Sequence, residues 1–334
     1  MRRIKRFAAR ALLTSAVACG GPAEDGCADR ADCPGGQACV FLSAAASRGV
    51  CVEPTSQEPP PGSLADSSLS HLQQLDVLFV IDDGPAIAGR AEQVGAAAAA
   101  FVAAVQTTRP RVELRVAVTS TAIEHPLCAA PVDIGALRTM SCRARLAAFT
   151  AEIDGATVDA RAACTAGCPF EQLTLRPTAT TRDTEVRVRP WLESDPWGTG
   201  NLPDGVSLTD AVRCAAPQGV AGCRFGGPVE AMRRALERMQ TEGDPAYGFL
   251  RDTADTLVVM IAAGNDCSLR PGSEEIFIDN PVFWGELTPP DLTPGVCWRA
   301  GVMCEGPGPV YPGCEARDLG LDGQPTTQSF SALR

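Results

Sequence analysis

The chain contains very little lysine, histidine and tyrosine. Its 334 residues include one lysine, Lys5, two histidines and two tyrosines. The sequence has no phosphate-binding loop, no Gly-x-Ser-x-Gly elbow and no Gly-Thr-Ser segment. These absences argue against nucleotide hydrolysis and against the common serine-hydrolase sites. No segment has enough consecutive apolar residues to predict a membrane-spanning helix.

The charge balance argues against a nucleic-acid partner. The formal net charge is −11. Five basic residues lie within residues 1–18, and without them 24 basic residues face 40 acidic ones, a formal charge of −16. So acidic a chain is repelled by a phosphate backbone. We therefore expect no binding to nucleic acid.

Residues 1–18 are predicted to be a signal peptide. A basic start, Arg2 to Arg10, precedes a short apolar stretch and then small residues that lead to Cys19. These small residues resemble a bacterial lipobox, with Ala16 where that motif usually has Leu. The resemblance implies cleavage before Cys19 and lipidation of its thiol; the alternative is simple secretion. Gly20 after the cysteine implies the outer membrane by the enterobacterial sorting habit. We therefore expect an exported, membrane-anchored lipoprotein of the outer membrane.

The cysteine count predicts disulfide bonds. Without Cys19, 14 of the 15 cysteines remain, an even number, as expected for an oxidising compartment. Zinc is the less favoured reading, because the chain lacks paired Cys-x-x-Cys motifs and Cys164-x-x-x-Cys168 is the closest spacing. Spacing does not determine the pairing. The candidates are Cys27, Cys33, Cys39, Cys51, Cys128, Cys142, Cys164, Cys168, Cys214, Cys223, Cys267, Cys297, Cys304 and Cys314.

Composition divides the chain into an anchor, a linker and a large domain. Residues 19–53 combine the lipidated cysteine with a small Cys-rich module that is too short for a core of its own. Residues 54–71 are rich in proline and serine and predict a linker. Residues 72–334 form the main domain. Within it we expect a disulfide-pinned insertion at 121–206 and a Cys-rich tail at 280–334.

The main domain has the pattern of an α/β fold. Two near-continuous apolar runs, Asp76–Asp83 and Thr256–Ala263, are typical of buried strands in a parallel sheet. We expect Val77–Ile81 and Leu257–Ile261 to lie side by side in the same direction. Another strand is predicted at Val112–Val118. The predicted helices are Ala86–Thr107, one from Ser207 to Cys214, and one that begins at Pro228, buries Val229, Met232, Leu236 and Met239, and stops before Gly243. This order predicts a doubly wound, mostly parallel sheet. No strong strand follows Ile278, so the sheet is expected to lack C-terminal edge strands.

An ordered set of short motifs resembles von Willebrand factor A-like domains of exported lipoproteins from myxobacteria-like organisms. The matching pieces lie between about residues 72 and 315. They are Asp76–Asp83, Gly222–Phe225 with the helix Val229–Met239, Gly248–Arg251, Asp266–Ser268 and Cys297–Cys304. The resemblance implies a metal-ion-dependent adhesion site with the motif Asp-x-Ser-x-Ser, a Thr from a second loop and an Asp from a third. Hydroxyl and carboxylate oxygens are the ligands that Mg²⁺ requires.

The chain departs from that motif at most positions. Asp82 stands at the first Asp, but Gly84 and Ala86 stand at the two serines and Ala263 at the late Asp. The Thr has no counterpart near Val220 and Ala221. The expectation is a degenerate site with vestigial Asp82, Asp83 and Asp266 and no resident cofactor. The alternative is Mg²⁺ or Ca²⁺ held by a rearranged set of these carboxylates.

These features predict a non-enzymatic lipoprotein of the cell envelope. Its main domain would bind an extracytoplasmic protein or glycan, or serve as a scaffold. The alternative is an exported hydrolase, because the segments around Asp82 and Asn265 look superficially like those of subtilisin-like proteases. That reading requires a base and a nucleophile. His71 lies in the linker, and His125 lacks the glycine-rich surroundings of that family.

Overall fold

The computed structural model describes residues 38–40, 50–52, 74–108, 112–128, 133–153, 155–195, 200–268, 274–278, 293–306 and 311–316. The chain separates into two units, Met1–Leu69 and Ser70–Arg334. In the first unit, β1 (Ala38–Val40) pairs antiparallel with β2 (Val50–Val52), so that the backbones of Cys39 and Cys51 are opposite. Cys19, Cys27, Cys33 and the predicted linker lie outside the described residues.

A mixed sheet of four strands forms the centre of the second unit. Its order is β7 (Leu192–Ser194), β4 (Glu113–Ser120), β3 (Gln74–Ile81) and β8 (Asp255–Ile261). β3 is parallel to both β4 and β8, whereas β7 is antiparallel to β4. Val77 is opposite Leu257 and Ile81 is opposite Ile261, which confirms the predicted side-by-side pairing. The unit is therefore an α/β fold.

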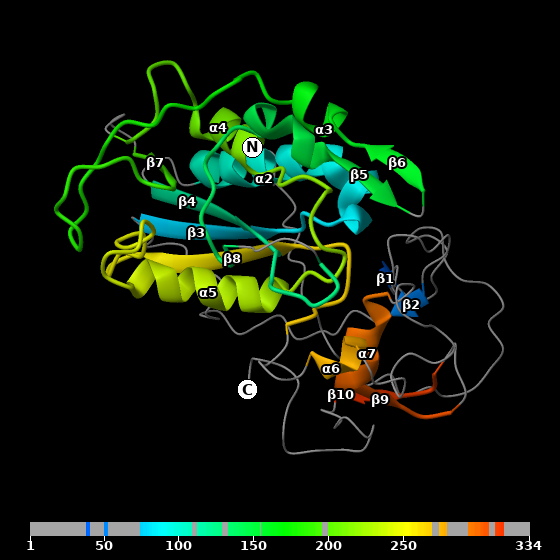
Figure 1. Ribbon diagram of the computed structural model, residues 1–334. Helices are drawn as coiled ribbons and strands as arrows, with labels where there is room; N and C mark the ends of the chain where they lie inside the picture. The colour runs from blue at the N-terminus through cyan, green and yellow to red at the C-terminus, as the bar shows by residue number, and fades with distance from the viewer. Residues whose placement is uncertain are drawn as a thin grey trace. The chain divides into compact units, whose positions relative to one another are not determined.

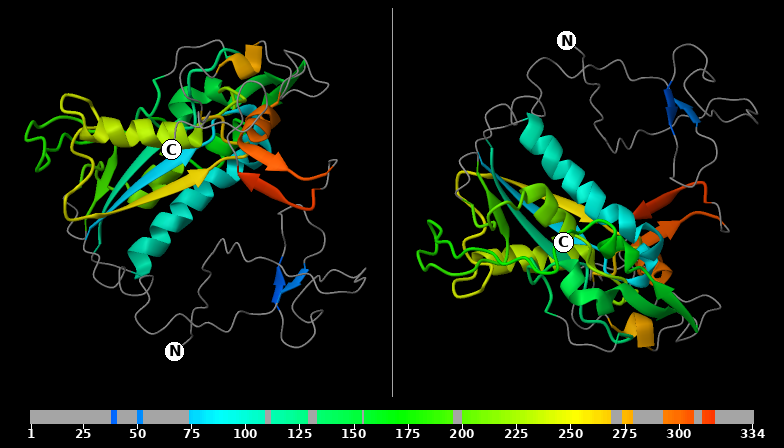
Figure 2. Two further views of the ribbon diagram at one scale, coloured as in Figure 1. Left: turned by 90° about the horizontal axis from the view of Figure 1, so that it is seen from below. Right: turned by 90° about the horizontal axis from the view of Figure 1, so that it is seen from above.

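Helices cover both faces of this sheet (Figures 1 and 2). α2 (Ala91–Thr108) and α4 (Leu208–Ala215) lie on one face, and α5 (Pro228–Gln240) lies on the other. Side chains alternate along a strand, so Phe79 of β3 packs in the core under α2 and α4 while Val80 packs in the core under α5. Each face of β3 is thus buried, as its apolar sequence predicts.

Local sequence signals set the helix ends. The helix predicted from Ala86 begins as a 3-10 turn, η3 (Pro85–Arg90), before α2. At the start of α4, the hydroxyl of Ser207 accepts the N–H of Asp210 at 3.1 Å and donates to its carboxylate at 2.7 Å, so the predicted capping pair is confirmed. Gly95 lets α2 approach α4 closely, because a Cβ there would lie 2.8 Å from the carbonyl oxygen of Arg213.

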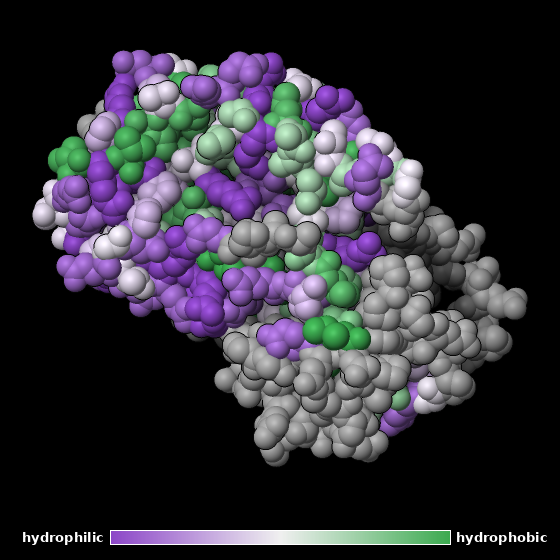
Figure 3. Space-filling model, viewed as in Figure 1, coloured by the Kyte–Doolittle hydropathy of each residue, from purple (hydrophilic) through white to green (hydrophobic). Residues whose placement is uncertain are grey.

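The buried face of α5 differs from the predicted one. Met239 is buried as expected, but the centre of the face is Ala231 and Ala235, whereas Val229 and Leu236 are only half-buried. Small side chains let the helix lie close to the sheet. A prediction that chose the buried positions by large apolar side chains therefore placed the buried face of the helix wrongly. The outer side of α5 is hydrophilic (Figure 3).

β8 is less buried than its sequence predicts. Leu257 is 39% exposed and Met260 is 41% exposed. Among the described strands β8 pairs only with β3, so it is an edge of the sheet rather than a central strand. The expectation of full burial was therefore wrong, because an apolar run does not specify how many neighbours a strand has.

The predicted insertion contains short elements tied by disulfides. They are η4 (Cys142–Phe149), a hairpin of β5 (Thr150–Ile153) and β6 (Ala156–Asp159), α3 (Ala162–Thr165) and β7. Three disulfides involve this segment: Cys142–Cys164, Cys168–Cys214 and Cys128–Cys223. The segment also supplies β7, so it completes one edge of the central sheet.

The tail packs around a second, smaller apolar cluster. Its elements are α7 (Gly295–Gly301), β9 (Val302–Cys304) and β10 (Cys314–Ala316). The short helix α6 (Glu275–Ile278) lies just before the tail and packs in the same cluster. Two further disulfides, Cys267–Cys297 and Cys304–Cys314, hold the tail. β9 and β10 form their own antiparallel pair and, within the described ranges, no strand after β8 joins the central sheet. A helix long and apolar enough to cross a membrane is absent from the described part of the chain.

Candidate functional site

The candidate site lies where β3, β4 and β8 end. Because these three strands are parallel, their carboxyl ends lie at one edge of the sheet, the usual position of ligands in α/β folds. Asp82 and Asp83 follow β3, Thr121 follows β4, and Ala263 comes shortly after the end of β8. The hydrogen bond from Thr121 N–H to the carbonyl of Ile81, at 3.0 Å, holds the first two of these ends together.

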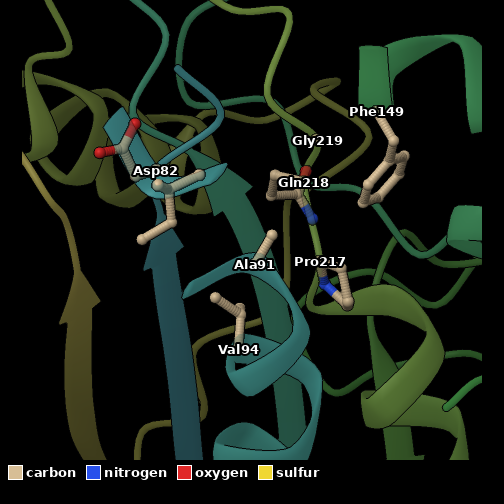
Figure 4. A pocket seen from close by; sticks show the side chains of 8 residues that line it. Asp82, Ala91, Val94, Phe149, Pro217, Gln218 and Gly219 are labelled. Atoms are coloured by element: carbon tan, nitrogen blue, oxygen red, sulfur yellow. The ribbon is translucent and has the colours of Figure 1, made fainter. Parts of the chain in front are cut away.

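Both carboxylate oxygens of Asp82 accept backbone hydrogen bonds. One accepts the N–H of Gly84 at 2.8 Å, and the other accepts the N–H of Ala263 at 2.9 Å. The residue is buried. Its carboxylate points away from Val94, Pro217 and the other apolar residues that line the adjacent hollow (Figure 4). That hollow is too narrow to hold a water molecule. Asp82 therefore fastens β3 to β8.

Asp83 is a buried carboxyl with basic neighbours. Burial raises its pKa, a hydrogen bond from Ser120 and the charge of Arg138 oppose the rise, and the nearby Asp82 adds to it. Arg138 Nη1 lies 3.9 Å from the carboxylate. Asp83 Oδ1 is buried and has no hydrogen-bond partner among the described residues. Gly222 allows this packing, since a Cβ there would lie 2.6 Å from Asp83 Oδ1.

A second arginine clamps the loop before Gly219. The guanidinium of Arg145 donates to the carbonyl oxygens of Gln218 at 2.7 Å, Ala215 at 3.4 Å and Pro217. Burial, together with repulsion from Arg138, lowers the pKa of Arg145 to about 10, while Asp83 opposes this shift. Two guanidinium charges thus act on the Asp83 side of the site.

Asp266 caps a helix in this structure. Its carboxylate accepts the N–H of Val229 at 3.3 Å and the hydroxyl of Ser268 at 2.7 Å, and Ser268 in turn accepts the N–H of Glu230 at 2.8 Å. These are the free N–H groups at the start of α5. Burial raises the pKa of Asp266, and the hydrogen bonds oppose this rise.

The residues present do not fit a six-coordinate Mg²⁺ site. Gly84 and Ala86 have no side-chain oxygen, and Ala263 contributes a backbone N–H, which repels a cation. Asp82 already accepts two hydrogen bonds, and Asp83 has a raised pKa beside Arg138. Mg²⁺ requires several hard, negatively polarised oxygens that converge on one point. The arrangement of these carboxylates instead supports a structural role.

The histidine and asparagine of the alternative hydrolase hypothesis are engaged in other contacts. His125 Nδ1 accepts the N–H of Leu127 at 3.2 Å, and Nε2 has no partner within the described part of the chain. Asn265 donates its side-chain amide to the carbonyl of Pro294 at 3.3 Å. His125 also lies near the sulfurs of Cys128 and Cys223, but these two form a disulfide. His71 lies outside the described residues.

Sequence reasoning identified the strand ends but missed the groups around them. Asp82, Asp83 and Ala263 were assigned to this edge of the sheet, and the structure brings all three there. Arg138 and Arg145 come from the irregular segment between β4 and α4, and no local signal points to them. Thr121, whose buried hydroxyl has no partner among the described residues, was also missed.

Comparison with protein-family models, with curated proteins and with solved structures found no match to this chain.

Proposed function

We propose that the chain is an exported, non-enzymatic lipoprotein of the cell envelope. Its main domain, a doubly wound von Willebrand factor A-like unit, binds an extracytoplasmic protein or glycan without a resident metal ion. Cys19 carries the lipid, and residues 19–71 hold the domain away from the outer membrane. The double use of the Asp82 carboxylate is the observation that supports binding without a metal.

Several features support a binding module of this kind. The loops at the carboxyl ends of β3, β4 and β8 are braced by backbone hydrogen bonds and by the Cys128–Cys223 disulfide. Exposed charged residues lie on and beside these loops: Glu124 is on the loop after β4, and Arg224 is on the loop before α5, next to the disulfide-bonded Cys223. A rigid set of loops that display polar groups loses little conformational entropy when it binds a partner.

Calorimetry with Mg²⁺, Mn²⁺ and Ca²⁺ tests the metal-free part of the proposal. We expect no heat of binding at micromolar metal. Micromolar binding that Asp82→Ala abolishes would contradict it. Stable labelling by a serine-directed fluorophosphonate probe would contradict the non-enzymatic part.

The anchor and the binding surface need separate tests. Cys19→Ser should move the protein from the detergent phase to the aqueous phase and remove the acyl groups from the N-terminal peptide in mass spectrometry. For the partner, a glycan array and chemical cross-linking in cells supply candidates, and saturable binding is then measured with pure components. Arg224→Glu should weaken that binding at least tenfold. Arg182→Glu, near the amino end of β8, is the matched control and should not change it.

A further inference from the structure

His125 occupies an aromatic slot in the second apolar cluster. Its ring stacks on Phe225 with centroids 4.3 Å apart and an interplanar angle of 6°. It also meets the ring of Phe277 edge-on at 4.1 Å. Phe225 precedes α5, and Phe277 belongs to α6. The imidazole therefore joins the loop after β4, the loop before α5 and α6.

The hydrogen bonding of this ring suits only its neutral form. Nδ1 accepts the N–H of Leu127, so in the neutral ring the proton resides on Nε2. Nε2 is buried and has no partner in the described residues. A second proton would have to occupy Nδ1, where it would face the Leu127 N–H. Protonation therefore breaks one hydrogen bond and places a charge among apolar side chains.

The charged residues nearby do not offset that charge. The loop after β4 carries Glu124 and the loop before α5 carries Arg224, and both are exposed. Glu274, which is half-buried, stands just before α6. Burial lowers the pKa of His125 from 6.5 to about 4 and is the one cause of this shift. The ring is therefore neutral at pH 7.

We propose that His125 is an acid-sensitive latch for α6, the short helix just before the tail. The neutral ring holds α6 against the loops beside it, and protonation releases α6 as a flap. The Cys267–Cys297 disulfide encloses α6 within a loop of the chain, so the flap stays attached to the domain when it opens. Opening would uncover Phe225 and Ile123 beside the carboxyl-end loops.

The direction of the pH dependence follows from the lowered pKa. The open form binds a proton near pH 6.5, whereas the closed form binds it only near pH 4. The closed form is therefore fully favoured above about pH 6.5 and loses its advantage as the pH falls to about 4. The opening equilibrium should rise on the order of a hundredfold across this window.

Hydrogen exchange of the full chain, with its disulfides intact, tests the latch. Protection factors of residues 274–278 should fall about a hundredfold from pH 7 to pH 4, while those of β3 stay high. His125→Phe keeps an aromatic ring in the slot and should remove this pH dependence. An equal fall in His125→Phe would overturn the proposal. So would a parallel loss of protection in β3, because the acid effect would then be global unfolding.

Nuclear magnetic resonance gives a test that does not require the His125 variant to fold. The chain has only two histidines, so His71→Gln leaves His125 as the one imidazole signal. That signal should titrate near pH 4. Titration close to pH 6.5 would show that the ring is solvated, and the latch would be wrong.

Discussion

The carboxylate of Asp82 accepts the backbone N–H of Ala263 at 2.9 Å, across the gap between the ends of β3 and β8. Asp82 is also a donor to the β8 side of this strand pair, because its backbone N–H donates to the carbonyl of Ile261 at 2.8 Å. The acidic residue that most resembles a metal ligand in the sequence is thus part of the sheet's own hydrogen bonding. Its replacement should therefore affect stability first.

We expect Asp82→Ala to lower the free energy of unfolding by about 3 kcal/mol, because it leaves two backbone N–H groups without their acceptor. Asp82→Asn should cost less, since its amide oxygen can still accept one of them. Urea unfolding at pH 7 measures both. The matched control is Asp204→Ala, which removes an exposed ion pair with Arg176 and should cost under about 1 kcal/mol. Equal costs for Asp82→Ala and the control would contradict the structural role.

The edge position of β8 predicts that two residues opposite each other on β3 and β8 differ in how well they tolerate substitution by lysine. Met260 and Val80 are register partners on neighbouring strands, but Val80 is fully buried and Met260 is 41% exposed. Met260→Lys should change the free energy of unfolding by no more than about 1 kcal/mol, while Val80→Lys should prevent folding. Circular dichroism and urea unfolding distinguish these outcomes. If both variants failed to fold, β8 would have a further neighbour.

The ion pair of Asp76 and Arg251 predicts a variant whose loss of stability depends on pH. Asp76 is fully buried; burial raises its pKa from 3.8, and Arg251, 2.7 Å away, opposes the rise. Arg251→Ala should raise that pKa further and cost roughly 3–5 kcal/mol at pH 7. Because the folded pKa is then raised, the loss relative to wild type should be small near pH 3.8 and should grow as the pH increases. Urea unfolding of both proteins at several pH values measures this.

Adding Asp76→Asn to the Arg251→Ala variant provides the control. The double variant has no buried carboxyl at this position, so its stability relative to wild type should vary much less with pH. A deficit of the single variant that stayed constant with pH would mean that the Asp76 carboxyl is solvated when Arg251 is absent.

The disulfides should contribute unequally to stability. Cys168–Cys214 spans 46 residues and is buried, whereas Cys304–Cys314 spans 10 residues. Loop-closure entropy gives about 4 kcal/mol for the first and about 3 kcal/mol for the second. Cavities left in the core by replacing buried cysteines with alanine increase the difference. Thermal unfolding of the two double Cys→Ala variants should therefore show the lower midpoint for Cys168→Ala/Cys214→Ala.

The parts of the fold that depend on neighbouring residues were predictable. Both apolar runs form strands, Ser207 caps α4, and α5 begins at Pro228. Among the distant contacts, the parallel pairing of the two runs was predictable, but others were not. β7 has only three residues, too few for a periodic signal, and the burial of β8 depends on how many strands flank it.

The candidate site divides in the same way. The location of Asp82 follows from the end of an apolar strand, which local sequence marks clearly. Its partner Ala263 is far along the chain and contributes a backbone N–H, which any residue except proline could supply, so sequence carries no signal for this bond. Arg138, which lies 3.9 Å from the Asp83 carboxylate, and Arg145, which acts on it only through its charge, likewise come from a segment without regular periodicity.

The pairing of β7 with β4 in the central sheet has a practical consequence for protein engineering. Trp191 and Glu193, beside or within this short strand, contact Arg115 of β4: the guanidinium lies 5.7 Å from the indole, and its Nε lies 2.6 Å from the carboxylate. Replacing residues 121–206 with a simple linker would remove Trp191 and Glu193. The Arg115 guanidinium would then be exposed and would have lost the carboxylate that balances its charge. Those who wish to minimise this domain should therefore trim the β5–β6 hairpin and leave the stretch around Trp191 intact.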